Sequence, residues 1–231
     1  MSTLTLVRHG QATPFEKVTD RLSETGVRQA QLLGSFWKRH GVAFHEVVCG
    51  TLERHKQTLE ASGLSAPVRF DAGWNEYRGD EIIARLSPVL EAQDEHYARL
   101  AAASREGMQG PERNRHFQKM LEALMSAWLQ GVVVAEGVES FAEFEARVLA
   151  SLRSAMEGPS GRDVLVITSG GPIGMCVRHA LQGPAEAFLD VNWRMRNTGI
   201  TEFTFSSSRF TLDTLNGLPH LLETRDLWTW L

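Results

Sequence analysis

The chain has 231 residues, of which 42% are hydrophobic and 23% are charged, and its formal net charge is −4. That length suits one α/β domain or a domain that carries an insertion. The mildly negative charge excludes a general attraction to nucleic acid or to anionic membranes, so a phosphate site would have to draw on local positive charge.

Cysteine usage and the chain's apolar stretches bear on the compartment. Cys49 and Cys176 lie in apolar segments without CxxC spacing, which predicts buried free thiols and a reducing compartment. The N-terminus has no basic segment followed by a long apolar run. No stretch reaches the roughly 20 apolar residues that span a bilayer. We therefore expect a soluble cytoplasmic protein.

The first part of the chain predicts alternating strands and helices. Apolar residues 3–8 predict a buried strand, and residues 46–49 and 68–70 predict two more. Apolar residues at helical spacing over 27–39 predict a helix between the first two strands, and another is expected over 51–61. This order favours a doubly wound sheet with parallel neighbours and right-handed crossovers.

Residues 76–137 interrupt this alternation. They predict two helices, over 86–104 and 112–130, which are separated by Gly107, Gly110 and Pro111. We interpret the segment as a helical lid inserted over the ligand-binding edge of the sheet, within a single domain of residues 1–231.

The core pattern resumes after the insertion. The predicted elements are a helix over 140–156, a strand over 163–168, a helix that follows Pro172, and a strand pair over 199–205 and 209–215. The apolar C-terminal residues 227–231 either pack on the chain's own core or form a subunit contact, which leaves a homodimer open.

Residues suited to phosphate chemistry follow three predicted strands. Arg8-His9-Gly10 follows the first, Gly50-Thr51 and then Arg54 follow the second, and Ser169-Gly170-Gly171 follows the strand over 163–168. In an open α/β sheet the carboxyl ends of the strands form the ligand-binding edge. Two guanidinium groups and a helix N-terminus at that edge would make an anion pocket, because both bind phosphate oxygens well.

The same pocket would need a nucleophile and an acid. A neutral imidazole can attack phosphorus, so His9 is the candidate nucleophile. Glu76 is the candidate acid for the leaving oxygen, although Asp80 and Glu81 are close enough in sequence to take that role. Gln11 either touches the phosphate or only shapes the turn.

Other polar residues have simpler interpretations. His55 fits an exposed position on its helix, His179 fits a structural position away from the sheet edge, and Thr51 fits a helix N-cap. No cluster of His, Asp or Glu has the spacing of metal ligands, so we expect neither a metal nor another cofactor.

Together the motifs resemble the histidine phosphatase superfamily, also called phosphoglycerate mutase-like. Arg8-His9-Gly10 is similar to the family signature, Arg54 with Gln57-Thr58 to its second phosphate arginine, and Asn75-Glu76 to its proton donor. The resemblance implies a three-layer α/β/α sandwich with a mostly parallel sheet. It also implies a His9 that becomes phosphorylated, Arg8 and Arg54 as phosphate ligands, and Glu76 as general acid and then base.

One position departs from the family pattern. The family's second histidine, which binds the transferring phosphoryl group, aligns with Ser169. A serine hydroxyl donates one hydrogen bond but brings no charge, and loss of a preorganised donor typically costs about 3–4 kcal/mol, or roughly 10²–10³ in rate. His55, beside Arg54, is the nearest candidate in sequence to supply the missing charge. Ser169 and Gly170 remain in the set expected to bind phosphate.

These features predict a metal-independent phosphatase that hydrolyses a small phosphomonoester through a phosphohistidine at His9. Ser169 keeps a second hypothesis open, namely a weakly active or non-catalytic protein that binds a phosphorylated ligand. A phosphomutase is favoured less, because the sequence around Glu76 lacks a further match to the mutase subgroup. The expected partner is a small phosphorylated molecule, and neither nucleic acid nor a membrane is expected.

Overall fold

A computed structural model describes residues 1–13, 20–106 and 112–230 of the chain. Its sheet has six strands in the order β3-β2-β4-β1-β5-β6. The strands are β1 (Ser2–Arg8), β2 (Glu46–Cys49), β3 (Val68–Phe70), β4 (Asp163–Thr168), β5 (Ile200–Phe205) and β6 (Phe210–Gly217). The strands expected from the sequence are therefore all present.

The pairing directions make a mixed sheet. β4 runs parallel to both β1 and β2, and β2 runs parallel to β3. β5 pairs antiparallel with β1 and with β6. The predicted doubly wound α/β architecture is confirmed, and its two last strands form an antiparallel extension of the parallel core.

The helices divide between two compact units of the chain, Met1–Glu76 with Arg147–Leu231 and Tyr77–Ala146. The α-helices are α1 (Glu24–His40), α2 (Glu53–Ser62), α3 (Gly79–Glu81), α4 (Ser87–Gln93), α5 (Glu95–Glu106), α6 (Arg113–Leu129), α7 (Phe141–Met156), α8 (Gly170–Leu181) and α9 (Ala187–Asn192). Short helical turns are η1 (Ala72–Trp74), η2 (Ile82–Leu86), η4 (Pro219–Leu221) and η5 (Arg225–Leu227). No helix in the described ranges is long and apolar enough to cross a membrane.

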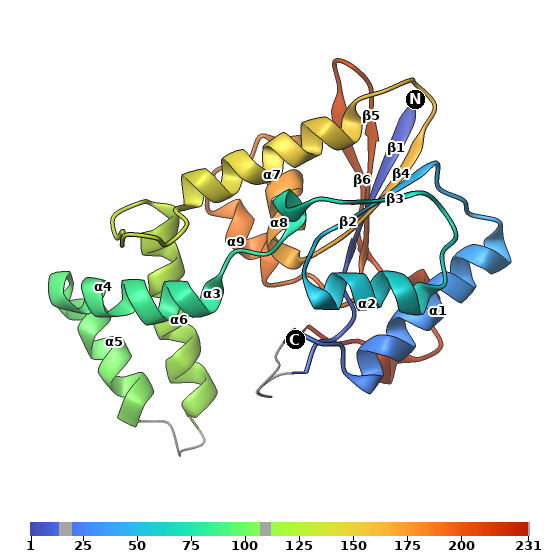
Figure 1. The fold of residues 1–231 in the computed structure, drawn as a ribbon. Helices are drawn as coiled ribbons and strands as arrows, with labels where there is room; N and C mark the ends of the chain where they lie inside the picture. The colour runs from blue at the N-terminus through green and yellow to red at the C-terminus, as the bar shows by residue number, and fades with distance from the viewer. Residues whose placement is uncertain (14–19, 107–111, 231) are drawn as a thin grey trace. The chain divides into compact units, whose positions relative to one another are not determined.

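Helices lie on both sides of the sheet in the first unit. Figure 1 shows α1 and α2 on one side and α8 on the other. On the α1 side, Leu33 and Trp37 pack into a buried cluster with inward side chains of the strands, among them Val7, Val47 and Leu165. β2 and β4 are nearly continuous apolar runs because both faces of the parallel core are covered.

The second unit has a small aromatic core of its own. The Trp128 ring lies 5.3 Å from the ring centroids of both Tyr77 and Phe141. The helix predicted over 86–104 is wrong in one respect, because α4 and α5 are separate. Asp94 takes an extended conformation (φ −132°, ψ 108°) between them and accepts a hydrogen bond from the Tyr97 backbone N–H at 3.0 Å. The break predicted at Gly107, Gly110 and Pro111 lies outside the described residues.

The cysteines match their expectation as buried free thiols. Burial raises the pKa of the Cys49 thiol to about 12 and also raises the pKa of Cys176. Neither side chain is therefore a thiolate at neutral pH.

A close helix contact yields a stability prediction. A Cβ added at Gly34 of α1 would lie 1.8 Å from the Ser62 carbonyl oxygen at the end of α2. G34A should therefore force α1 and α2 apart and lower the free energy of unfolding by about 1–3 kcal/mol, as overpacking does. Urea denaturation would measure this, with S35A on the exposed face of α1 as the matched control. Equal stability of G34A and S35A would contradict this packing.

Candidate active site

The site is built where β1, β2 and β4 end. The register sets Arg8 beside Thr168 and Cys49 beside Ile167. The residues that follow continue the ladder, since the backbone N–H of His9 donates to Thr168 O at 2.9 Å and that of Gly50 to Ile167 O at 3.0 Å. The sequence-predicted strand ends therefore meet at one edge, as expected for parallel strands.

His9 is buried, with 6% of its surface exposed, and its ring is held at both nitrogens. Nδ1 lies 2.7 Å from the Gly10 carbonyl oxygen, which can only accept, so Nδ1 carries the proton. Nε2 then carries the lone pair, and it accepts a hydrogen bond from Arg54 Nε at 3.1 Å. Burial, with the Arg54 and Arg8 guanidiniums, holds the pKa of His9 well below its usual value. The imidazole is thus neutral, and its basic nitrogen faces an arginine.

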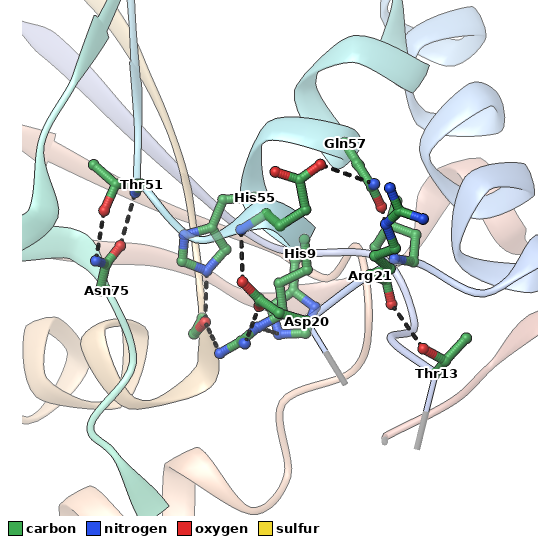
Figure 2. A network of polar contacts seen from close by, with 12 residues as sticks. His9, Thr13, Asp20, Arg21, Thr51, His55, Gln57 and Asn75 are labelled. Carbon is green, nitrogen blue, oxygen red and sulfur yellow. Dashed lines mark hydrogen bonds and ion pairs between the residues drawn. The ribbon is translucent and has the colours of Figure 1, made fainter. Parts of the chain in front are cut away.

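Arg54 is fixed by a residue that the sequence analysis did not single out. Its Nη1 forms an ion pair with Asp20 Oδ1 at 2.6 Å, and Asp20 also accepts the Glu53 backbone N–H at 2.8 Å (Figure 2). Nη2 of Arg54 reaches Ser169 Oγ at 3.5 Å. Asp20 lies two residues before Leu22, and no role was expected of it from the sequence.

Arg8 contacts the C-terminal part of the chain. Its Nη1 donates to the carbonyl oxygens of Met195 at 2.5 Å and Trp230 at 2.7 Å. The tail also binds elsewhere in the first unit, because Thr229 Oγ1 donates to Asn197 Oδ1 at 2.8 Å and Gln29 Nε2 donates to the Leu227 carbonyl at 2.7 Å. Residues 227–230 therefore pack on their own chain, and residue 231 lies outside the described residues.

Ser169 and His55 form a buried pair beside His9. Both are 0% exposed, and His55 Nε2 lies 2.7 Å from Ser169 Oγ. The His55 ring centroid is 5.7 Å from that of His9. The interpretation of His55 as an exposed helix residue is therefore wrong. The first turn of α2 directs it inward, and Gly50 leaves it room, because a Cβ there would lie 2.1 Å from His55 Nδ1.

Glu76 meets the start of α8. Its Oε2 accepts the backbone N–H of Gly171 at 3.0 Å, next to the buried Gly170. Arg147 braces the preceding turn, donating to the carbonyl oxygens of Gly73 at 3.0 Å and Asn75 at 2.9 Å. The predicted acid thus lies at the helix N-terminus that Ser169 begins.

Thr51 and Gln11 form side-chain hydrogen bonds that connect loops. Thr51 is not the N-cap of α2, which is Leu52; its Oγ1 accepts a hydrogen bond from Asn75 Nδ2 at 2.7 Å. The Gln11 side-chain oxygen accepts the Ser23 hydroxyl at 2.8 Å at the entry to α1. Of the two interpretations of Gln11, this contact supports shaping of the turn.

The arrangement suits an anion more than a cation. Arg54, the Ser169 hydroxyl and the first turn of α8 all present positive or donor groups near His9. Within the described residues, no three side chains of His, Cys, Asp or Glu are grouped so that they could hold a metal ion.

Comparison with known proteins identifies a family that the chain matches. The model of the histidine phosphatase superfamily (branch 1) matches residues 4–130 and 100–217. An uncharacterized protein of Mycobacterium leprae (strain TN) is 33% identical over 69 residues, which cover 30% of this chain and 43% of that protein. That match spans less than half of the relative's length.

Several solved structures share the fold. YhfR of Bacillus stearothermophilus has a TM-score of 0.66 at 19% identity, covering 96% of this chain and 100% of that one. The alpha-ribazole phosphatase of Shigella flexneri has a TM-score of 0.62 at 19% identity, covering 93% and 96%. Phosphoserine phosphatase of Entamoeba histolytica, in complex with 3-phosphoglyceric acid, has a TM-score of 0.58 at 19% identity, covering 96% and 100%.

The two buried histidines predict a pH dependence of stability. Burial is also the main cause that lowers the pKa of His55, followed by the charge of Arg54. Both histidines are neutral when folded, whereas unfolded histidine binds a proton below about pH 6.5. Their contribution is thus fully present above that pH and is lost as the pH falls toward their native pKa values, at up to about 1.4 kcal/mol per pH unit for each.

Denaturation by urea from pH 7.5 to 5 measures this slope. H55Q should make the acid-side slope shallower than in the parent, because one of the two neutral imidazoles is gone. S35A, on the exposed face of α1, serves as the control and should leave the slope unchanged, because it removes no titratable group. Identical slopes in all three proteins would show that His55 does not stay neutral in the folded state.

Proposed function

The chain belongs to the histidine phosphatase superfamily, and we propose that it is a phosphatase that transfers a phosphoryl group from a small phosphomonoester to Nε2 of His9. One observation carries the proposal. The Gly10 carbonyl fixes the proton on Nδ1, so the lone pair of Nε2 is presented beside the Arg54 guanidinium. A neutral imidazole with its nucleophilic atom beside a phosphate-binding group is the arrangement that this chemistry requires.

The proposed first step is displacement at phosphorus. Nε2 of His9 forms a bond to phosphorus while the ester P–O bond breaks and its electron pair leaves with the alcohol oxygen. Glu76, in its acid form, gives that oxygen a proton. Arg54, the Ser169 hydroxyl and the amide groups at the start of α8 stabilise the negative charge on the phosphoryl oxygens.

The second step regenerates the enzyme. The Glu76 carboxylate takes a proton from a water molecule, and the resulting oxygen attacks phosphorus. The P–N bond breaks, its electron pair returns to Nε2, and inorganic phosphate leaves. Arg8 keeps its proposed role as a phosphate ligand, and its positive charge also favours the neutral, nucleophilic form of His9. No metal ion is assigned a part in either step.

The substrate is proposed only as a class. The fold relatives include an alpha-ribazole phosphatase and a phosphoserine phosphatase, whose names indicate small phosphate esters. The insertion over residues 76–137 is proposed to determine specificity and to act as a lid. A panel of phosphorylated metabolites would rank candidates for this chain. Action in the cytoplasm and the absence of nucleic acid and membrane partners are part of the same proposal.

The second candidate is a phosphate-binding protein without efficient turnover. Ser169 favours it, since a serine stands where the family resemblance places a charged imidazole. Calorimetry with inorganic phosphate and a turnover assay separate the two. Binding without hydrolysis of any ester in the panel would support the second candidate over the phosphatase.

The nucleophile can be tested directly. The parent protein should hydrolyse p-nitrophenyl phosphate in the presence of a chelator and form an acid-labile, alkali-stable phosphoenzyme. H9A should lose both the activity and the label, because it removes the attacking nitrogen. H179A, an exposed histidine on α8, is the matched control and should keep both. Activity that survives in H9A would disprove the phosphohistidine route.

The acid can be tested through the leaving group. E76Q should slow phosphoenzyme formation from an alkyl phosphate by about 10²–10⁴, the usual contribution of a positioned general acid. The loss should be much smaller with p-nitrophenyl phosphate, because p-nitrophenolate leaves without protonation. Rapid-quench measurement of the single-turnover rate compares the two esters. Equal losses with both esters would remove Glu76 from the role of acid.

A further inference from the structure

We propose that His55 is a positioning residue for phosphoryl transfer, which orients the Ser169 hydroxyl so that its proton points toward the phosphoryl group. In this way the buried His55–Ser169 pair takes the place of the imidazole that the family resemblance puts at residue 169. The inference rests on the proposed phosphatase function and extends it to a residue that the family motifs do not include.

The His55–Ser169 pair is a buried part of the site. Both side chains are fully buried, and the 2.7 Å contact between Nε2 and Oγ joins the first turn of α2 to the N-cap of α8. The absence of a side chain at Gly50 gives the ring its space. The His55 ring lies near His9, with 5.7 Å between the ring centroids (Figure 2), and its Nε2 contacts Ser169 Oγ.

Hydrogen-bond capacity indicates which atom carries the His55 proton. Nδ1 is buried and has no hydrogen-bond partner among the described residues. A proton there would leave a buried N–H without an acceptor, which proteins rarely tolerate, whereas an unpaired acceptor is less rare. The proton therefore belongs on Nε2, which donates it to Ser169 Oγ.

The Ser169 hydroxyl can then still donate one hydrogen bond. Its oxygen offers two lone pairs, and these accept from His55 Nε2 at 2.7 Å and Arg54 Nη2 at 3.5 Å. With both lone pairs engaged, the hydroxyl proton remains the group that can bind a further partner. A phosphoryl oxygen bound between His9 and Arg54 is the acceptor that this proposal assigns to it.

Three substitutions at residue 55 test the relay. In H55Q the side-chain amide can reach the place of Nε2, whereas in H55N the shorter amide ends at the place of Nδ1 and leaves Ser169 without its donor. H55A removes the ring altogether. We expect H55N and H55A to slow single-turnover phosphorylation of His9 by about 10²-fold, as loss of one preorganised donor does. H55Q should recover at least half of that loss on a logarithmic scale.

The effect should fall on the rate and leave KM within about threefold, because the relay acts on charge that develops in the transition state. K56A, an exposed neighbour on α2, is the matched control and should behave as the parent. Circular dichroism confirms folding of each variant. Since H55Q and H55N are both polar and similar in size, their comparison decides the question even where H55A fails to fold.

Variants that remove the Ser169 hydroxyl, or move the imidazole from residue 55 to residue 169, test the relay further. S169A and the double variant H55A/S169A should be equally slow, because His55 has nothing to orient once the hydroxyl is gone. H55A/S169H restores an imidazole at residue 169 and should phosphorylate His9 at least about tenfold faster than H55A. Additive losses in the double variant, or no gain from S169H, would overturn the relay.

The outcomes separate this inference from the function on which it rests. A parent protein that forms phosphohistidine, with H55N and H55Q equal to it, overturns the role of His55 and leaves the phosphatase in place. If the parent protein forms no phosphohistidine with any ester in the panel, the proposed function and the relay are both overturned. Slow H55N with recovered H55Q supports both.

Discussion

Parallel pairing of β4 with both β1 and β2 is the constraint on which the site depends. Because the three strands run in the same direction and in register, their last residues come level, and the loops that follow emerge at one edge. His9, Gly50 and Ser169 are each the first residue after one of these strands. A shift of one residue in either pairing would turn the strand faces over and separate the three groups.

The pocket keeps its polar groups buried by giving them defined partners. Arg54 is partly buried, with 19% of its side chain exposed, and a charge taken out of water is costly unless it is paired. Asp20 lies on one nitrogen of its guanidinium and His9 on another. The same burial removes protons from His9 and His55, so positive charge is concentrated on the arginine while the imidazoles stay neutral. A positive guanidinium and an unprotonated imidazole nitrogen can thus lie side by side, with Nε2 of His9 accepting a hydrogen bond from Arg54, which a pocket of protonated histidines would not allow.

Much of this fold could be predicted from the sequence because its signals are local. The strand over 46–49 and the strand that ends before His9 each depend on neighbouring residues, and the structure has both as expected. The family resemblance likewise predicted that Arg54 and Glu76 lie near the edge of the sheet where His9 and Ser169 are found. The break at Asp94 was missed because helical spacing continues across it, and the extended backbone there is a single residue.

The missed site residues depend on contacts between distant segments. Whether His55 faces solvent or the sheet is decided by Gly50 and Ser169, and the latter is 114 residues away in the chain. Asp20 meets Arg54 at a separation of 34 residues. Periodicity carries no information on such pairs, so the sequence indicated a phosphate pocket but not the side chains that hold it in place.

The central position of β1 has a consequence for the order in which the protein can assemble during synthesis. β1 precedes both of its sheet neighbours, since β4 and β5 begin at Asp163 and Ile200, and Arg8 meets Trp230 across a separation of 222 residues. Closing such long loops costs entropy before any contact repays it, which is typical of slowly folding topologies. β1 therefore leaves the ribosome long before β4 and β5, its two neighbours in the sheet. During that interval its apolar residues need shielding from other chains.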